Sequence, residues 1–454
     1  MSSEVLWSAP TAERPVDALV RVPGSKSLTA RWMLLAAIAD EPTELRGALV
    51  SRDTRLMRDA LERLGAVLSV EDGALQVVPL PPAGEHPAEP VEVHCGLAGT
   101  VMRFVPLLAA LHRGDVRFTG DEGALRRPMA PVIQVLRDQG VEVTEHGEPG
   151  HLPFTVHGTG SLPGGRVEID ASASSQFISN ALLVGSRTER GLEVVQVGAT
   201  LPSLPHIAMT VETLAEVGIE VSHDLDEQGR HRWRVPAAEL TMDQVTVEPD
   251  LSNAGPFLAA AMVTSGTIAV ADWPETTTQP GDAYRELLAR MGAEVWREED
   301  EVCVRGTGEI HGIDADLSEV GELTPTIAAL AALADSPSHL RGIGHLRGHE
   351  TDRLHALATE LTKLGALTVD HADSLEITPG PLTGGVFETY EDHRMATAAA
   401  IVGLRVPGVQ VVDVATTQKT LPDFVGMWLA MLHTDPPEEI EDVPAPRSPA
   451  EAPA

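Results

Sequence analysis

The sequence contains little cysteine and no long apolar run. Its two cysteines, Cys95 and Cys303, are too few for a disulfide framework or a cysteine-rich metal site. No apolar run is long and uninterrupted enough to span a bilayer. The first ten residues hold no basic region followed by an apolar core, so we expect no signal peptide and a cytoplasmic protein.

Positive charge is also scarce. The chain has 33 Lys and Arg residues against 67 Asp and Glu residues, a formal net charge of -34. A surface this acidic repels nucleic acid and anionic membranes, so we expect neither as a partner. The sequence has three lysines, Lys26, Lys363 and Lys419. Lys363 lies in a helical pattern and is expected on the surface. Lys26 and Lys419 lie in short segments flanked by Gly, Ser and Thr, which makes them candidates for a functional site.

An internal repeat organises the chain. An amphipathic helix, a glycine and a strand recur in that order at intervals of 73 to 78 residues. The glycines are Gly65, Gly140, Gly218, Gly292 and Gly365. Glycine commonly ends a helix because it takes the left-handed conformation at little cost. The pattern therefore predicts α/β units of about 75 residues.

A second pattern repeats in phase with the first. A polar segment of small residues leads into an Ala- and Leu-rich helix. The copies are GSKSLTARWMLLAAIA, GLAGTVMRFVPLLAAL, SASSQFISNALLVG, DLSNAGPFLAAAMV, GELTPTIAALAAL and YEDHRMATAAAIV. These helices are apolar nearly all round, which predicts that they are buried inside their domain.

Six units of this size favour two globular domains of three units each, because solenoid repeats are usually shorter, about 20–50 residues. We expect an N-terminal domain at 24–246 and a discontinuous C-terminal domain formed by 1–23 and 247–433. The sixth unit lacks a returning strand, which the stretch 5–22 can supply. The acidic, proline-rich segment 434–454 is expected to be disordered.

The starts of the six apolar helices suggest an anion-binding site. Helix N-termini carry partial positive charge and free N–H groups. If the helices of a domain run in parallel, three N-termini meet at one face, and two such faces across a cleft attract anions. Hydroxyl and basic residues stand at these starts, which predicts a substrate set with several negative groups. No HExxH or CxxC motif occurs, so we expect no metal site.

Seven segments, in chain order, resemble the EPSP synthase family of enolpyruvyl transferases. They are PGSKSLTAR (23–31), LAGTVMR (97–103), RRPM (126–129), SSQF (174–177), ETDR (350–353), EDHRM (391–395) and QKTLPDF (418–424). The resemblance implies a two-domain, inside-out α/β barrel built from six βαβαββ repeats, with the active site between the domains. It also implies transfer of the enolpyruvyl group of phosphoenolpyruvate to the 5-hydroxyl of shikimate 3-phosphate. No cofactor is implied, the partners are small-molecule substrates, and we expect a monomer that glyphosate inhibits.

The resemblance also implies roles for individual residues. Shikimate 3-phosphate would be bound by Lys26, Ser27, Arg31, Ser174, Ser175, Gln176, Ser203, Glu322, His345 and His349. Phosphoenolpyruvate would be bound by Lys26, Gly99, Arg127, Gln176, Arg353, Arg394 and Lys419. The catalytic residues would be Lys26, Lys419, Glu322 as the base for the 5-hydroxyl and Glu350 as the acid for the methylene carbon.

The sequence departs from the family pattern at five positions. Leu97 and Phe104 stand where asparagine and proline are frequent. Glu322 replaces the commoner aspartate and is one methylene longer. His345 and His349 replace asparagine and lysine. These changes affect the fine geometry of the pockets but keep the set of lysines, arginines and carboxylates.

Two other functions remain open from the sequence. One is the enolpyruvyl transferase that acts on UDP-N-acetylglucosamine, which has the same six-unit fold. The segments SKS, SSQF and ETDR count against it. The other is a catalytically inactive anion-binding protein of the same fold. The joint presence of Lys26, Glu322, Glu350, Arg394 and Lys419 counts against that alternative.

Overall fold

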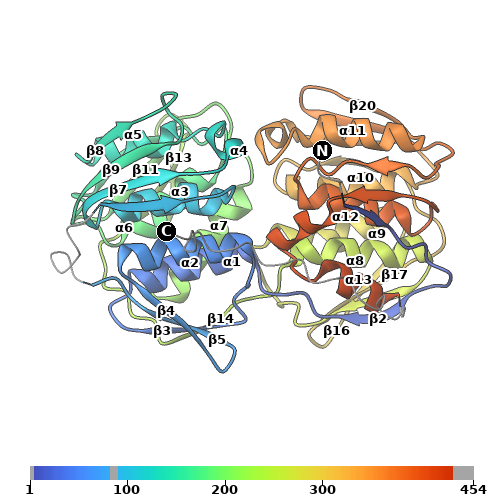
Figure 1. The fold of residues 1–454 in the computed structure, drawn as a ribbon, viewed down its shortest axis with the longest axis horizontal. Helices are drawn as coiled ribbons and strands as arrows, with labels where there is room; N and C mark the ends of the chain where they lie inside the picture. The colour runs from blue at the N-terminus through green and yellow to red at the C-terminus, as the bar shows by residue number, and fades with distance from the viewer. Residues whose placement is uncertain (1–4, 82–89, 433–454) are drawn as a thin grey trace, which may run out of the picture.

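The computed structural model describes residues 5–81 and 90–432, so the disorder expected for 434–454 lies outside the described residues. The chain forms two halves that lie side by side (Figure 1). Buried apolar side chains form one cluster between Leu28 and Val247 and a second that joins Ala9–Val22 to Leu251–Met431. We call residues 24–247 the first half and residues 5–23 with 248–432 the second half. Within the described residues, no helix is long and apolar enough to cross a membrane.

The first half contains three four-stranded mixed sheets. In each, a parallel pair of strands is extended by an antiparallel hairpin. The orders in space are β14(Gln244–Thr246)–β3(Thr43–Arg46)–β5(Ala74–Val78)–β4(Val67–Glu71), β6(Val91–His94)–β7(Arg113–Thr119)–β9(Phe154–Thr159)–β8(Glu142–Glu145) and β10(Gly165–Ile169)–β11(Leu192–Gln196)–β13(His231–Val235)–β12(Ser222–Leu225). Strand β14, from the end of this half, thus completes the sheet of its first unit.

The second half contains two four-stranded sheets and one of three strands. The orders are β2(Asp17–Val20)–β15(Thr267–Val270)–β17(Glu301–Arg305)–β16(Glu294–Glu298), β18(Asp314–Asp316)–β19(Ser338–Arg341)–β21(Ser374–Thr378)–β20(Leu367–Asp370) and β22(Val386–Phe387)–β23(Gln410–Val412)–β1(Leu6–Ser8). Strand β1 pairs antiparallel with β23, and β2 pairs parallel with β15. The prediction that 5–22 supplies a strand to the sixth unit is therefore confirmed, and the same stretch adds a strand to the fourth.

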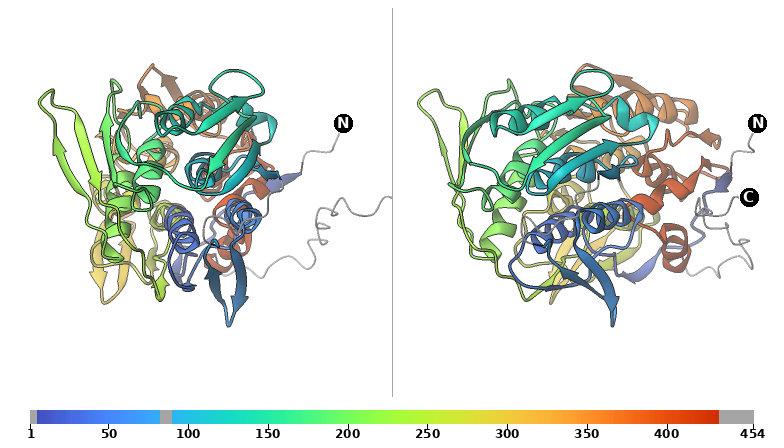
Figure 2. Two further views of the ribbon diagram at one scale, coloured as in Figure 1. Left: turned by 90° about the vertical axis from the view of Figure 1, so that its left-hand side faces the viewer. Right: turned by 60° about the vertical axis from the view of Figure 1, so that its left-hand side comes forward.

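The apolar helices of the second repeat pattern form the interior of each half. They are α1(Lys26–Ala37), α3(Gly99–Ala109) and α6(Gln176–Gly185) in the first half, and α8(Leu251–Thr264), α10(Thr324–Ala332) and α12(His393–Gly403) in the second. Nearly every residue of these helices is buried, which confirms the prediction of all-round burial. Figures 1 and 2 show most strands on the outside of the two halves, with these helices within.

Further helices, one in each repeat unit, complete the two halves. They are α2(Arg52–Leu64), α5(Ala130–Asp138), α7(Leu204–Glu216), α9(Tyr284–Arg290), α11(Arg353–Leu364) and α13(Phe424–Met431). The five repeat glycines follow the first five of these helices with φ between 78° and 118°. Each is followed by a strand, as predicted. The remaining helical segments are α4(Glu122–Leu125) and the 3₁₀ turns η1(Pro280–Ala283), η2(Gly321–Leu323), η3(Gly344–Gly348) and η4(Val414–Lys419).

The two halves are joined by a pair of adjacent chain segments. Gly24 and Pro249 form an antiparallel bridge, and the Ser25 amide donates to the carbonyl of Glu248 at 2.7 Å. A Cβ atom on Gly24 would lie 2.0 Å from the carbonyl oxygen of Gly47, so this position excludes any side chain. The two connections therefore run as one short ribbon directly before α1 and α8, whose first residues face the pocket described next.

Candidate active site

A pocket lies between the two halves, at the N-terminal ends of the interior helices. Every residue predicted to bind substrate or to act in catalysis lines it. These residues are Lys26, Ser27, Arg31, Gly99, Arg127, Ser174, Ser175, Gln176, Ser203, Glu322, His345, His349, Glu350, Arg353, Arg394 and Lys419. Residues far apart in the chain thus meet at one place because each repeat unit directs the start of its interior helix toward the same cleft.

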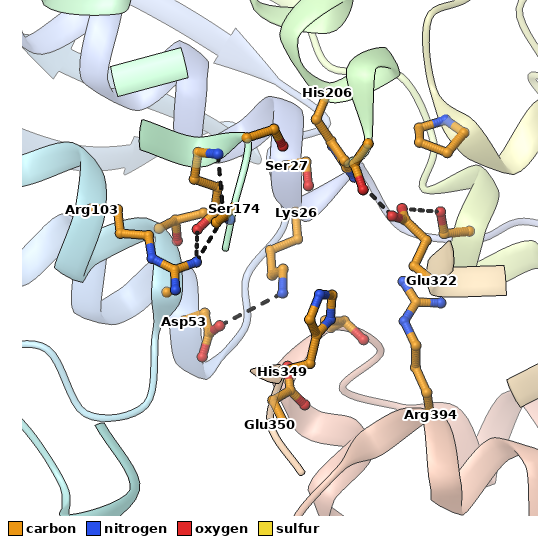
Figure 3. Close-up of a pocket in the computed structure, with 18 of the residues that line it drawn as sticks. Lys26, Ser27, Asp53, Arg103, Ser174, His206, Glu322, His349, Glu350 and Arg394 are labelled. Carbon is orange, nitrogen blue, oxygen red and sulfur yellow. Dashed lines mark hydrogen bonds and ion pairs between the residues drawn. The ribbon is translucent and has the colours of Figure 1, made fainter. Parts of the chain in front are cut away.

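Lys26 begins α1 and projects into this pocket (Figure 3). Its Nζ atom lies 3.8 Å from Oδ2 of Asp53, whose side chain is 2% exposed. Burial lowers the pKa of Lys26, and the attraction of Asp53 offsets this only in part. The backbone amide of Lys26 donates to Oδ2 of Asp250 at 3.2 Å, which ties the start of α1 to the start of α8. Lys26 therefore lies where both halves meet.

Two buried arginines shape the first-half side of the pocket. Arg103 donates from one nitrogen, Nη1, to Ser174 Oγ at 3.0 Å and to Gln176 Oε1 at 2.9 Å. Arg31 donates to Thr210 Oγ1 at 2.9 Å and to the carbonyl of Ser27 at 2.9 Å. Burial lowers the pKa of Arg31 to about 9, so it stays charged at neutral pH. Arg103 thus fixes the Ser174 hydroxyl and the Gln176 amide, which line the pocket, and Arg31 holds the backbone at Ser27.

Glu350 lies at the centre of a charged cluster on the second-half side. Its Oε1 atom is 2.8 Å from Lys419 Nζ, and its Oε2 atom is 2.9 Å from His393 Nδ1. Burial opposes ionisation of Glu350, but Lys419, His393 and Arg353 outweigh it and hold its pKa well below the usual range. Arg353 pairs with Asp392 through Nε at 2.7 Å and Nη2 at 3.2 Å. The cluster therefore pairs two cations, Lys419 and Arg353, with the carboxylates of Glu350 and Asp392.

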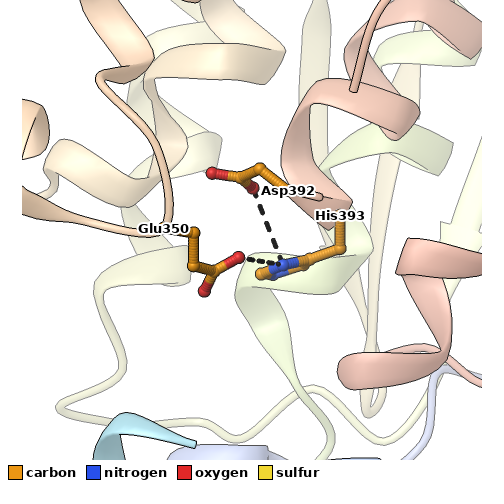
Figure 4. Close-up of side chains that lie close together, drawn as sticks. All are labelled: Glu350, Asp392 and His393. Carbon is orange, nitrogen blue, oxygen red and sulfur yellow. Dashed lines mark hydrogen bonds and ion pairs between the residues drawn. The ribbon is translucent and has the colours of Figure 1, made fainter. Parts of the chain in front are cut away.

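The same cluster is the one place, among the described residues, where three groups could together ligate a metal ion. Ligand atoms of Glu350, Asp392 and His393 lie within 4.8 Å of one another (Figure 4). Asp392, however, already accepts from Arg353 and, at 2.9 Å, from the amide of Arg394. Glu350 already pairs with Lys419. Since cations already neutralise both carboxylates, the residues present do not suit a divalent metal.

Arg127 and Gly99 face each other on the first-half side. A Cβ atom on Gly99 would lie 2.9 Å from Nη2 of Arg127, so glycine allows this guanidinium to lie against the start of α3. Arg127 donates to the carbonyl of Leu97 at 3.1 Å, while its buried Nε has no partner. This contact uses the backbone of Leu97, so it does not depend on the replacement of the commoner asparagine. The departure on α3 itself is Phe104, whose ring centroid lies 5.5 Å from the guanidinium carbon of Arg31.

Glu322 and the two substituted histidines lie on the second-half wall. Burial alone would raise the pKa of Glu322, but His206, Arg394 and Ser252 hold it well below the usual range. Burial, together with repulsion from Arg353, lowers the pKa of His349 far below its usual value, so its ring is neutral. His349 Nδ1 therefore accepts from Arg353 Nη1 at 3.3 Å. Burial lowers the pKa of His345 as well.

Other pocket-lining residues have no individual role in substrate binding or catalysis assigned from the sequence. They include Asp53, Arg103, His206, Ser252 and His393. Arg103 and His393 lie inside the segments LAGTVMR and EDHRM, so position within a motif was a usable signal for them. Ser252 stands at the start of the fourth apolar helix, which is also a local signal. Asp53 and His206 carry no such signal, because their contacts in the pocket join residues 27 and 116 positions apart. Cys95, in contrast, is fully buried, and burial raises the pKa of its thiol, so it is not a nucleophile here.

Comparison with solved structures defines the class of fold. An EPSP synthase from Acinetobacter baumannii superposes with a TM-score of 0.76 at 23% identity, over 93% of this chain and 97% of that one. The enolpyruvyl transferase NikO from Streptomyces tendae gives a TM-score of 0.70 at 18% identity, over 93% and 96% of the two chains. The α/β arrangement with six small mixed sheets is thus the EPSP synthase fold.

Comparison of sequences then gives the family. The sequence model of EPSP synthase (3-phosphoshikimate 1-carboxyvinyltransferase) matches residues 10–428. A 3-phosphoshikimate 1-carboxyvinyltransferase from Kocuria rhizophila is 53% identical over 95% of this chain and 97% of its own length. A second, from Bifidobacterium longum, is 49% identical over 94% and 98%. The chain therefore belongs to the EPSP synthase family and is an enzyme of that activity, 3-phosphoshikimate 1-carboxyvinyltransferase.

Proposed function

We propose that the pocket binds shikimate 3-phosphate and phosphoenolpyruvate together and joins them. Shikimate 3-phosphate lies toward the first half, where Ser27, Arg31, Ser174, Ser175, Gln176 and Ser203 meet. Phosphoenolpyruvate lies against Gly99, Arg127, Arg353, Arg394 and Lys419, and Lys26 contacts both substrates. The observation that carries this proposal is the convergence of hydroxyls, arginines and lysines from both halves on one pocket. Together with the starts of the interior helices, these groups give the pocket fixed positive charge in a chain of net charge -34.

The chemistry requires one group that accepts a proton and one that donates a proton. Glu322 takes the proton of the 5-hydroxyl as that oxygen bonds to C2 of phosphoenolpyruvate. Glu350, with Lys419 beside it, delivers a proton to the methylene carbon C3, which gives C2 the electrophilic character that the oxygen needs. Loss of a proton from C3 then restores the double bond as the C2–O bond to phosphate breaks. The products are 5-enolpyruvylshikimate 3-phosphate and inorganic phosphate.

The acid role of Glu350 depends on the charge of the bound substrates. In the free protein Lys419, His393 and Arg353 keep this carboxyl ionised. Phosphoenolpyruvate brings a phosphate and a carboxylate to the same cations, which weakens their hold on Glu350. Its pKa must then rise, because nearby negative charge disfavours the ionised form. With its pKa raised, Glu350 takes up a proton from water as phosphoenolpyruvate binds, and this is the proton that it then delivers to C3.

Phosphate release tests this function and separates it from both alternatives. The enzyme should release phosphate with shikimate 3-phosphate plus phosphoenolpyruvate, and not with UDP-N-acetylglucosamine plus phosphoenolpyruvate. Turnover of the sugar nucleotide instead would assign the other enolpyruvyl transfer. Binding of both substrates by calorimetry with no phosphate release would identify an inactive anion-binding protein.

Three further features belong to this proposal. We propose that 24–246 forms one domain and that 1–23 with 247–433 forms the other, each an inside-out barrel of three βαβαββ units. The separate hydrophobic clusters and the repeated strand order support that division. We also propose a monomer, since the pocket is lined by residues of one chain from both halves. The proposed place of action is the cytoplasm, where the two soluble phosphorylated substrates are expected to be available.

A further inference from the structure

Both oxygens of Glu322 are held by groups from different parts of the chain. His206 Nε2 lies 2.8 Å from Oε2, and Ser252 Oγ donates to Oε1 at 3.1 Å. Glu322 lies on η2 in the second half, whereas His206 lies in the first turn of α7 in the first half. Figure 3 shows the imidazole of His206 directed across the cleft toward Glu322. The pair therefore exists only where the two halves meet.

The backbone of His206 is anchored in the proposed shikimate 3-phosphate pocket. Its carbonyl accepts from Arg31 Nη2 at 2.8 Å and from Thr210 Oγ1 at 3.1 Å. The turn before it places Ser203 in the left-handed region, with φ 57° and ψ 48°. Few non-glycine residues adopt that conformation, and they persist only where their surroundings hold them. Arg31 and Ser203 therefore fix the position from which the imidazole reaches Glu322.

A second contact supports the same junction between the halves. The Ser203 amide donates to the carbonyl of Ser318 at 3.4 Å. The start of α7 and the residue before it thus contact the region of η2 at two points. Ser203 bonds to Ser318, and His206 bonds to Glu322. Glu322 is one methylene longer than the aspartate frequent in the family, and its carboxylate makes the contact with His206 at 2.8 Å.

We propose that His206 is a positioning residue that orients Glu322 for removal of the 5-hydroxyl proton. This rests on the proposed function, in which Glu322 is the base. A carboxylate has about four lone-pair sites. With Ser252 and His206 each occupying one, the carboxylate has a fixed plane, and its free lone pairs face the pocket that binds shikimate 3-phosphate. The 5-hydroxyl proton passes to Glu322, and the part of His206 in this step is to keep the carboxylate in place.

Several charged or titratable groups act on Glu322 from the elements around it. They are His206 on α7, Arg31 on α1, Tyr284 on α9, His345 on η3, Arg353 on α11 and Arg394 on α12. Of these, His206 is hydrogen-bonded to the carboxylate. Because it stabilises the ionised form, its removal should raise the pKa of Glu322 and move the acidic limb of the kcat/KM profile to higher pH.

The test compares His206→Ala, His206→Gln and the matched control His157→Ala. His157 pairs with Asp115 at 2.7 Å, a histidine–carboxylate pair that does not line the pocket. His206→Ala should lower kcat roughly 10-fold or more with little change in KM for phosphoenolpyruvate, and should shift the acidic limb upward. In His206→Gln the side-chain amide N–H can donate to Glu322 in place of Nε2–H. This variant should therefore recover most of kcat, and the acidic limb of its kcat/KM profile should lie at the wild-type pH. His157→Ala should match the wild type.

A double-mutant cycle with Glu322→Gln distinguishes positioning from general damage. If His206 acts through Glu322, His206→Ala should cost much less in the Glu322→Gln background than in the wild type. The proposal is overturned if His206→Ala lowers kcat equally in both backgrounds. It is also overturned if the acidic limb of the kcat/KM profile does not shift, or if only KM for shikimate 3-phosphate rises. Failure of the wild type itself to release phosphate would instead refute the proposed function, so the two failures are separable.

Discussion

Lys419 Nζ and Glu350 Oε1 lie 2.8 Å apart, with the two side chains 6% and 15% exposed. Lys419 ends η4, and Glu350 begins the ETDR segment that leads into α11, so segments far apart in the chain supply the two charges. A pair this buried is poorly screened by salt, and loss of one partner leaves the other charge uncompensated. The proposed proton donor and the proposed phosphoenolpyruvate ligand are thus one electrostatic unit.

The first prediction concerns Glu350→Gln. Glutamine keeps the shape of the side chain and can still meet Lys419 and His393, but it cannot deliver a proton to C3. We expect kcat to fall roughly 10²-fold or more, with a smaller effect on KM for phosphoenolpyruvate. Steady-state kinetics measure this, with the exposed Glu309→Gln as control. A variant that raises KM alone would show that Glu350 binds substrate and does not transfer a proton.

The second prediction uses the scarcity of lysine. Lys26→Met removes the charge that lies between the two proposed substrates while keeping much of the aliphatic length. Turnover should be abolished, and the far-ultraviolet circular dichroism spectrum should match the wild type. Lys363→Met is the matched control, because Lys363 pairs with Glu360 on α11 and does not line the pocket. Near wild-type kcat in a folded Lys26→Met variant would remove Lys26 from the catalytic set.

The sequence predicted the site residues better than the contacts among them. Lys26, Arg353 and Arg394 were found because each stands at the start of a helix within a short motif. The five repeat glycines could be predicted because the end of a helix requires a left-handed residue, which depends only on the local backbone. All five have positive φ. The strand β14 could not be assigned to the sheet of β3, because parallel pairing across about 200 residues leaves no local pattern.

The interactions of Asp53 and His206 were likewise beyond the sequence. Asp53 has the ordinary pattern of an acidic residue in the first turn of a helix, and only the folded chain brings it near Lys26. His206 gains its partner from η2, more than 100 residues away. Such contacts depend on how distant segments pack together, whereas a sequence motif indicates only the structure of its own short segment.

The third prediction concerns Gly99→Ala. The new Cβ would lie 2.9 Å from Arg127 Nη2, closer than side chains tolerate, so the guanidinium must move by a few tenths of an ångström. If Arg127 holds the anionic groups of phosphoenolpyruvate and of glyphosate, both should bind more weakly. We expect a higher inhibition constant for glyphosate and a higher KM for phosphoenolpyruvate. Gly348→Ala is the control in the same pocket, since its Cβ would meet nothing within 4 Å. An unchanged inhibition constant in Gly99→Ala would place the inhibitor elsewhere.

The fourth prediction is the pH dependence of stability without substrates. His349 and His393 are buried, and burial lowers the pKa of both below the ordinary value of 6.5. The unfolded chain therefore binds protons on these rings first, and stability falls as the pH drops below about 6.5. Glu350 and Glu322 also have lowered pKa values, through Lys419 and His206 respectively, so a further loss begins below about 4.5. Melting temperatures between pH 8 and pH 4 should show both declines. In His349→Gln the first decline should be smaller, and a pH-independent melting temperature would contradict the assigned shifts.

The fifth prediction is that shikimate 3-phosphate closes the cleft. Lys26, Arg31 and Arg127 belong to the first half, and Arg353, Arg394 and Lys419 to the second, so like charges approach each other when the halves meet. Without an anion this repulsion favours separation about the ribbon at Gly24 and Pro249. A phosphate between the basic groups reverses the sign of the interaction, and a ligand that binds the closed form better shifts the population toward it.

Small-angle scattering with and without saturating shikimate 3-phosphate measures this closure. The radius of gyration should decrease with the ligand and change again when glyphosate is added. Arg394→Gln should reduce the response, because it removes one of the cations that the anion neutralises. A profile that does not change with ligand in the wild type would mean that the cleft is permanently formed. In that case the His206–Glu322 contact would be a fixed feature of the fold, and closure would not be part of the reaction.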